Sequence, residues 1–351
     1  MTGASAPAVL AQQRPNKRVN EMRLVIFGAG SIGATIGARL YEAGKEVVFI
    51  ARGRHGERLR QQGLSFVSAA GRRRLRIPTV THPAALRFRS DDIVLLSVKS
   101  QQTVVALEAL RAAGGDQLPV ICAQNGVANE RMALRCFASV YAMVVMLPAT
   151  HLQPGEVISF AEDSGGILDA GCFPQGVDER ITAVCEQLSA AGFSARPDPQ
   201  VMRLKYAKLL TNLGNAVQAL CGRVPEADHA ELGARLAAEG LACYAAAGID
   251  CASEAELKER RRPLRLHRLP DVQRQGGSSW QSIARATGEV EADYLNGEIA
   301  QLGRLHGVPT PFNVVCQREV QRLARQRGPA GAMALEQLLA LVDEQAAVDA
   351  G

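Results

Sequence analysis

The amino-acid sequence predicts an α/β domain built on a doubly wound, mainly parallel sheet, followed by an all-helical domain. Short β-branched runs alternate with helical stretches from Met22 to about Pro199, and the strand signal disappears after Gln200. Such alternation is typical of a parallel sheet with helices on both faces. The chain has 351 residues, which is long enough for two packed domains.

The elements of the first domain follow from short apolar runs and from helical periodicity. Buried strands are predicted over Arg23–Phe27, Glu46–Ala51, Asp92–Ser97, Pro119–Ala123 and Ser139–Leu147. Helices are predicted over Ser31–Glu42 and Gln101–Ala112. Later runs predict two edge strands, a closing helix and a linker, at Glu156–Phe160, Gly166–Asp169, Val177–Ala191 and Arg196–Pro199. Residues 22–198 are therefore expected to form one domain.

Long amphipathic stretches follow the linker, at about 200–220, 226–248, 280–305 and 312–326. They predict a helical domain over residues 199–345. An open α/β sheet binds its ligand at the carboxyl ends of its strands. We therefore expect a cleft at that edge, closed by the helical domain.

Composition excludes several classes of protein. The net charge is only +5, aromatic residues make up 4%, and the basic clusters Arg72–Arg76 and Arg260–Arg268 contain no aromatic residue. We interpret these clusters as solvated faces and expect no nucleic-acid partner; a partner-binding surface over 258–268 is the alternative. The apolar run Val140–Pro148 is far shorter than the ~20 residues of a membrane span.

The cysteines and the N-terminus favour a cytoplasmic protein. The eight cysteines include no C-x-x-C pair, so we expect neither a zinc site nor a disulfide framework, and no metal is predicted. Residues 1–21 lack the features of a secretory signal and are expected to form a flexible extension. The oligomeric state stays open, with a homodimer as one option.

A glycine-rich motif predicts a dinucleotide site. The first strand runs directly into Gly28-Ala29-Gly30-Ser31-Ile32-Gly33, and a helix follows. In this Rossmann-type context Gly28 permits the tight turn, Gly30 lets the pyrophosphate approach, and Gly33 lets helix and strand pack closely. The helix N-terminus then offers free N–H groups to the phosphates.

The end of the second strand indicates which dinucleotide binds. NAD sites carry Asp or Glu there, to accept hydrogen bonds from the ribose hydroxyls. In this sequence the strand is followed by Arg52, and no carboxylate occupies the position. A guanidinium would pair with a 2′-phosphate, so NADP(H) is favoured over NAD(H); an ordinary surface arginine is the alternative.

A polar stripe opens the helical domain. Lys208, Asn212 and Asn215 are spaced i, i+4 and i+7, which places an amine and two amides on one helix face among apolar neighbours. Burial lowers the pKa of a lysine and makes it a usable acid or base near neutral pH. Lys205 competes with Lys208 for this role, and a helix face bonded to nearby backbone is the alternative to both.

The chain resembles the ketopantoate reductases (2-dehydropantoate 2-reductases) from Met22 to about Val342. The resemblance is carried by the order and spacing of several short segments rather than by any one of them. They are Gly28–Gly33, Arg52, Val98–Thr103, Gln124–Gly126, Lys208–Asn212, Ser278-Ser279, Glu291–Gly297 and Gly307–Asn313.

The resemblance implies NADPH-dependent reduction of a 2-oxo acid, as in pantothenate and coenzyme A biosynthesis, and it implies roles for individual residues. Lys208 would be the general acid. The substrate would be held by Asn212, Asn215, Ser279 and Glu291, and the cofactor would be contacted by Lys99 and Asn125. A helix break near Gly288 would turn Glu291 back into the cleft; a solvated first turn of a helix is the alternative for this carboxylate.

The sequence departs from the family at the substrate end. Ala216, Gly276 and Val290 stand where the family usually has Asn, Asn and Thr, and the Asp that often follows the paired serines is missing. Reduction of a 2-oxo acid is therefore better supported than ketopantoate itself. The alternatives are a related hydroxy-acid dehydrogenase with another substrate and a catalytically silent NADP(H)-binding regulator.

Overall fold

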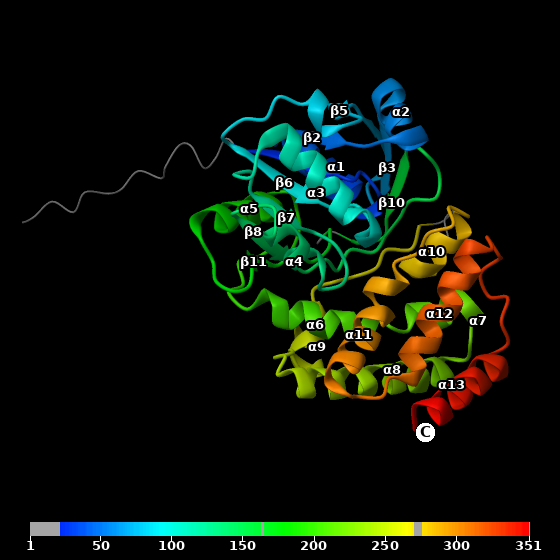
Figure 1. Ribbon diagram of the computed structural model, residues 1–351. Coiled ribbons are helices and arrows are strands. Elements are labelled where there is room, and N and C mark those ends of the chain that lie inside the picture. The colour runs from blue at the N-terminus through cyan, green and yellow to red at the C-terminus, as the bar shows by residue number, and fades with distance from the viewer. Residues whose placement is uncertain (1–21, 163–164, 270–275, 351) are drawn as a thin grey trace, which may run out of the picture.

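The computed structural model describes residues 22–162, 165–269 and 276–350. Figure 1 shows an α/β half containing the strands and a helical half packed against one side of it. The extension expected over residues 1–21 lies outside the described residues. Within the described ranges, every helix is too short or too polar to cross a lipid bilayer.

A seven-stranded sheet organises the α/β half, with the strand order β11-β8-β7-β6-β1-β2-β5. All neighbours in it are parallel except β11, which pairs antiparallel with β8. The order reverses beside β1, as a doubly wound sheet requires. The strands are β1 (Arg23–Phe27), β2 (Val47–Ile50), β5 (Thr79–Val80), β6 (Asp92–Leu96), β7 (Val120–Cys122), β8 (Val140–Met143) and β11 (Ala170–Cys172).

Both faces of this sheet are buried, which explains why its strands are nearly continuous apolar runs. Leu24 and Ile26 on β1 pack into one core, whereas Val25 between them packs into the core on the opposite face. The surrounding helices are α1 (Ser31–Glu42), α2 (Gly53–Gln62), α3 (Thr103–Gly114), α4 (Asn129–Leu134) and α5 (Glu179–Ala190), with short 3-10 turns η2 (Pro83–Ala85) and η3 (Ser100–Gln102).

A second sheet of four strands lies beyond α1, in the order β4-β3-β10-β9. It consists of β3 (Leu64–Ser68), β4 (Gly71–Leu75), β9 (Ala149–Thr150) and β10 (Glu156–Ser159). A strand is present where one was predicted at 156–160, but it is not an edge strand. It is β10, which pairs with β3 on one side and with β9 on the other. The strand expected over 166–169 is also displaced, since the ladder with β8 begins at Ala170.

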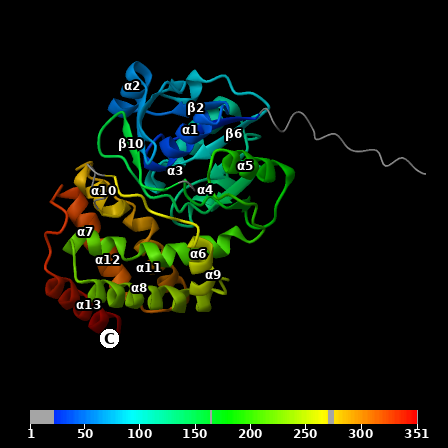
Figure 2. The ribbon, with the colours of Figure 1, turned by 180° about the vertical axis from the view of Figure 1, so that it is seen from behind.

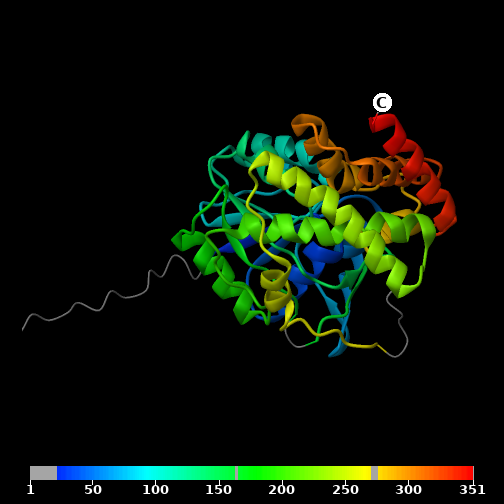
Figure 3. The same cartoon turned by 90° about the horizontal axis from the view of Figure 1, so that it is seen from below.

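The helical half follows from Val201 and packs around its own apolar core, which includes Tyr244 and Phe312. Seen from below in Figure 3, it covers the strands, with α13 at its edge. Its elements are α6 (Val201–Asn212), α7 (Asn215–Cys221), α8 (Glu226–Ala247), α9 (Glu254–Arg261), α10 (Ser278–Ala284), η4 (Ala292–Tyr294), α11 (Asn296–His306), α12 (Pro311–Arg325) and α13 (Leu335–Ala350).

Two of the predicted helical stretches are interrupted. The stretch 200–220 divides into α6 and α7 at Leu213 and Gly214, where backbone bonds of the i to i+3 type tighten the chain. The stretch 280–305 is broken as the glycine at 288 predicts, because Ala286 and Gly288 both have positive φ, at 50° and 81°. The second break places Glu291 just before η4.

Candidate active site between the two halves

The glycine-rich turn joins β1 to α1 at the edge of a cleft. Gly28 has a φ of 103°, and a Cβ there would lie 2.7 Å from the Val98 nitrogen. A Cβ on Gly33 would lie 2.2 Å from the Gly28 carbonyl oxygen. Glycine at both positions therefore lets the start of α1 lie close against β1.

This turn fits the pyrophosphate of a dinucleotide. The residues Gly28 to Ile32 line a cleft of about 890 Å³ between the two halves. Gly30 is the N-cap of α1 and supplies no side-chain cap, so N–H groups of the first turn stay available. A Cβ added to Gly30 would meet no atom within 4 Å, so the space in front of this backbone is open.

His55 holds the turn in place from α2. The Gly155 N–H donates to His55 Nδ1 at 2.9 Å, so Nδ1 is the acceptor and Nε2 carries the hydrogen. Nε2 then donates to the Ala29 carbonyl at 2.7 Å. Burial lowers the pKa of His55, although the Ala29 carbonyl opposes this shift. The sequence reasoning missed His55, whose only signal was its position shortly after Arg52.

Arg52 lies at the end of the cleft beyond the second strand. It is the N-cap of α2, is exposed, and lines the cleft. Among the described residues, its guanidinium forms neither an ion pair nor a hydrogen bond. Glu291 is the one carboxylate among the described residues that line the cleft, and it lies at η4 in the helical half. The guanidinium of Arg52 is thus available to an anionic group.

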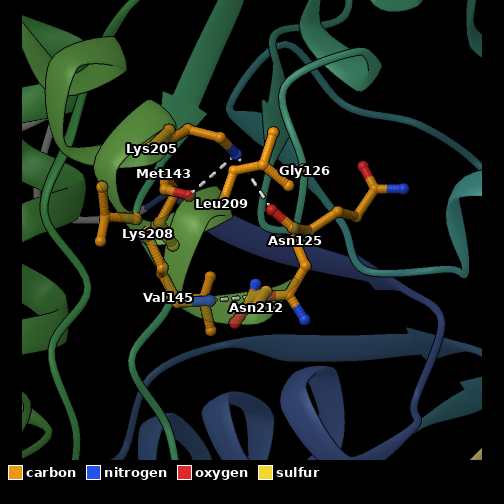
Figure 4. Close-up of a pocket in the computed structure, with 10 residues that line it drawn as sticks. Asn125, Gly126, Met143, Val145, Lys205, Lys208, Leu209 and Asn212 are labelled. Atoms are coloured by element: carbon orange, nitrogen blue, oxygen red, sulfur yellow. Dashed lines mark hydrogen bonds between the residues drawn. The ribbon is translucent and has the colours of Figure 1, made fainter. Parts of the chain in front are cut away.

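At the other end of the cleft, Lys208 reaches from α6 to the loop after β7. Its Nζ donates to Asn125 Oδ1 at 2.5 Å, and both residues line the cleft. Figure 4 shows the two side chains meeting in a narrow pocket walled by β8, the Asn125 loop and α6. The amine is half-buried, which leaves it accessible to a ligand.

The surroundings of Lys208 lower its pKa from 10.5 to about 7. Burial is the main cause, followed by the positive charges of Lys205 and Arg261, while Glu291 acts in the opposite direction. An amine with this pKa exists in both protonation states near neutral pH. It can therefore donate a proton to a developing alkoxide and be reprotonated by solvent.

Lys205, one turn earlier on α6, is occupied by the protein itself. Its Nζ donates to the carbonyls of Gln124 at 3.0 Å and Met143 at 3.2 Å, and it pairs with Glu130 at 2.7 Å. The side chains of Lys205 and Glu130 are 3% and 0% exposed. All three donors of this ammonium are used, so it anchors α6 to the sheet and has no proton to offer a ligand.

Glu291 and Lys99 meet from opposite halves of the molecule. Lys99 follows β6, and its Nζ forms an ion pair with Glu291. The same carboxylate accepts hydrogen bonds from the Ser100 N–H at 3.0 Å and the Ser100 hydroxyl at 3.1 Å. Burial raises the pKa of Glu291, but Lys99 and Ser100 outweigh burial and hold it below its ordinary value. The solvated-turn alternative for Glu291 is therefore wrong, since the residue is 5% exposed.

Asn212 and Asn215 both line the cleft, even though a helix break separates them. The Asn212 amide nitrogen is buried and has no hydrogen-bond partner among the described residues. A buried, unpaired donor facing a cleft indicates a missing acceptor, such as a carboxylate or carbonyl oxygen of a ligand.

The structure places the paired serines differently from the prediction. Ser279 is 4% exposed and does not line the cleft, whereas Ser278 does. Successive residues of a helix point about 100° apart, so α10 presents one serine of the pair to the cleft and turns the other into the protein. The side chain that faces the cleft is Ser278.

Several cleft residues were not predicted from the sequence. Arg285 follows α10 and donates to the His151 carbonyl at 3.0 Å and to the Ser282 hydroxyl at 3.3 Å. Lys258 and Arg261 line the cleft from α9. The signal for Lys258 and Arg261 was the run of basic side chains at 258–268, which we interpreted as solvated; Arg285 lies outside this run.

The site combines three features: a glycine turn suited to a dinucleotide, a helical second half, and a lysine with a pKa near neutral in the cleft between the two halves. Together they define an oxidoreductase of the two-domain Rossmann type. The sequence matches Ketopantoate reductase PanE/ApbA over residues 24–174, and Ketopantoate reductase PanE/ApbA C terminal over residues 200–324. The chain belongs to the ketopantoate reductase family.

Similar proteins span nearly the same length. The chain is 27% identical over 335 residues to a 2-dehydropantoate 2-reductase of Mesorhizobium japonicum, covering 88% of this chain and 99% of the relative. It is 26% identical over 299 residues to a 2-dehydropantoate 2-reductase of Pyrococcus horikoshii, covering 83% and 94%.

Solved structures show the same fold. A PanE/ApbA family ketopantoate reductase from Ralstonia eutropha is 27% identical, with a TM-score of 0.72 and coverage of 87% of this chain and 99% of that one. A D-mandelate dehydrogenase bound to NADH and anilino(oxo)acetate has a TM-score of 0.74 at 20% identity, with the same coverage. The second likeness concerns the fold alone.

Proposed function

We propose that this protein reduces a 2-oxo acid to a 2-hydroxy acid with NADPH, and that 2-dehydropantoate is the first substrate to test. The observation that carries the proposal is Lys208, whose amine has a pKa of about 7 and lies 2.5 Å from Asn125 in the cleft that also contains the glycine turn. The names of the relatives support the same reaction, and a place in pantothenate and coenzyme A biosynthesis is part of the proposal.

Different residues of the chain bind the cofactor and donate the proton. The glycine turn and the N-terminus of α1 bind the pyrophosphate, and Lys99 and Asn125 lie along the wall toward the reacting end. When bound, the reduced nicotinamide supplies the hydride. Lys208 in its ammonium form polarises the keto oxygen and transfers a proton to it as negative charge develops there.

Four polar groups that line the cleft with Lys208 are suited to hold the substrate. The unpaired amide of Asn212 can donate to the carboxylate or carbonyl oxygen, and Ser278 and Asn215 line the wall nearby. Glu291 lies within range of the charge of Lys208 and is fixed by Lys99, so it can accept a hydrogen bond from a hydroxyl group without being protonated itself. Ser279 is buried and does not line the cleft, so it is not assigned to the substrate.

The preference for NADPH over NADH is supported by Arg52. Its exposed guanidinium lies after β2 and has no partner among the described residues, and no carboxylate occupies the position that would bind the ribose hydroxyls. A charge-assisted and bidentate contact with a 2′-phosphate would satisfy this guanidinium.

A spectrophotometric assay of NADPH oxidation tests the proposal. The panel contains ketopantoate together with linear and branched 2-oxo acids, and each is assayed with NADPH and with NADH. We expect turnover of at least one 2-oxo acid, with a higher kcat/KM for NADPH. Absence of turnover with every acid, combined with tight NADPH binding, would instead favour a silent NADP(H)-binding regulator.

A further inference from the structure

Helix α9 is fixed beside α6, the helix that carries Lys208. Arg203 on α6 forms ion pairs with Asp250 at 2.8 Å and Glu256 at 2.9 Å. Leu257 on α9 packs into an apolar cluster that also contains Leu204. These ion pairs and the apolar packing therefore hold α9 in a defined position along the wall of the cleft.

The segment after α9, residues 262–269, is hydrogen-bonded to the α/β half. The His267 N–H donates to the Phe160 carbonyl at 2.8 Å, and the Glu162 N–H donates to the Arg265 carbonyl at 3.1 Å. Figure 2 shows this segment crossing between the two halves of the molecule. The C-terminal end of α9 is thus anchored from both sides of the cleft.

The basic residues at this end of α9 differ in their partners. Arg260 is 7% exposed and forms two bonds to the Asp169 carboxylate, at 2.5 and 2.6 Å. Arg262 pairs with Glu259 at 3.5 Å. The side chains of Lys258 and Arg261 form neither ion pairs nor hydrogen bonds with any residue that the structure describes. They lie three residues apart, on one face of the helix, and both line the cleft.

The charges that line the cleft are strongly unbalanced. Seven described lining residues are basic (Arg52, Lys99, Lys208, Lys258, Arg261, Arg262 and Arg285), and one, Glu291, is acidic and already paired with Lys99. Such a surface concentrates positive potential and attracts anions. The glycine turn and Arg52 serve the phosphates of the cofactor, which leaves the cations near Lys208 for another group.

We infer that Lys258 and Arg261 bind a second acidic group of the substrate, so that the enzyme prefers 2-oxo acids carrying two anionic groups. This inference rests on the proposed reduction of a 2-oxo acid. Arg261 and Lys208 line the same cleft from the neighbouring helices α9 and α6, and the positive charge of Arg261 acts on Lys208. An acid group on the distal end of the substrate would accept charge-assisted hydrogen bonds there.

The test compares two substrates with the same five-carbon backbone, 2-oxoglutarate and 2-oxopentanoate, at saturating NADPH. We expect a higher kcat/KM for 2-oxoglutarate. Arg261→Gln and Lys258→Gln should each lower the ratio of the two kcat/KM values by about tenfold, the effect of one charge-assisted hydrogen bond, and Arg261→Glu should lower it further. The ratio is used because any change in the protonation of Lys208 affects both substrates and cancels.

Arg268→Gln is the matched control, since this exposed arginine of the same segment does not line the cleft; it should leave the ratio unchanged. A parent enzyme that prefers 2-oxopentanoate, or an Arg261→Gln variant with an unchanged ratio, overturns the inference. A raised KM for NADPH with an unchanged ratio overturns it too, because the anion would then be a cofactor phosphate. The proposed reduction itself fails only if neither acid, nor ketopantoate, supports NADPH oxidation.

Discussion

Substitution of Lys208 by alanine should remove the proton donor and its pH dependence together. With a pKa of about 7, half of the Lys208 amines carry the proton at neutral pH. Two pH units higher, about 1% do, so kcat/KM for oxo-acid reduction should fall about 50-fold over that interval. Because Lys208 donates the proton, reduction needs its ammonium form. Activity is therefore lost as the pH rises through the pKa of Lys208.

The Lys208→Ala variant should lose about 10²- to 10⁴-fold in kcat, the usual contribution of a positioned general acid. It should also lose the inflection near neutral pH. The assay is NADPH oxidation over a pH series with the best substrate of the panel. An unchanged inflection in the variant, or turnover within about threefold of the parent at neutral pH, would refute the role of this lysine.

The kcat profile provides a second check on the same residue. kcat/KM reports groups of the free enzyme, and kcat reports groups of the enzyme–substrate complex. A bound carboxylate and cofactor phosphates near Lys208 favour its charged form and raise its pKa. The inflection of kcat should therefore lie at higher pH than that of kcat/KM. Coincident inflections would show that no anionic group approaches the amine.

Four further predictions concern residues with other roles. Arg52→Gln should lower the ratio of kcat/KM for NADPH to kcat/KM for NADH by about tenfold or more. Arg54→Gln is the control, because Arg54 is exposed and does not line the cleft; it should leave this ratio unchanged. Gly33→Ala should destabilise the unliganded fold by about 1–3 kcal/mol in denaturant titrations, because its Cβ would lie 2.2 Å from a backbone oxygen. Gly30→Ala should leave the fold intact and weaken NADPH binding in a fluorescence titration. Lys205→Met should lower the free energy of unfolding by about 3–5 kcal/mol by leaving a buried carboxylate unpaired; a Tm equal to that of the parent would contradict its anchoring role.

The parts of the fold that were predictable are those with a strong local pattern. β1, the glycine turn and α1 were predicted with their observed bounds, because a buried parallel strand and an amphipathic helix each have a clear periodicity. β4 was not predicted, since its sequence Gly71–Leu75 is mostly arginine and its strand conformation depends on pairing with β3. Arg72 and Arg74 are exposed as expected, whereas Arg73 is half-buried and pairs with Glu42.

The site was less predictable wherever a role depends on contacts between distant parts of the chain. The pair Ser278-Ser279 gives no sign of which hydroxyl faces the cleft, because that depends on the rotation of α10 in the finished fold. The sequence of the basic run at 258–268 likewise does not show that its arginines lie in different environments. Arg260 is bound to Asp169, 91 residues away, whereas its neighbour Arg261 lines the cleft.

The two lysines of α6 show how partners, rather than residue type, assign a function. Lys205 is buried and Lys208 is half-buried, and both lie next to the loop that carries Gln124 and Asn125. The Nζ of Lys205 is fully occupied by two carbonyls and the Glu130 carboxylate. Lys208 has one neutral partner and lies near the positive charge of Lys205, so burial and this charge together lower its pKa more than Glu291 raises it. The anchored lysine thus helps to make the neighbouring one an acid near neutral pH.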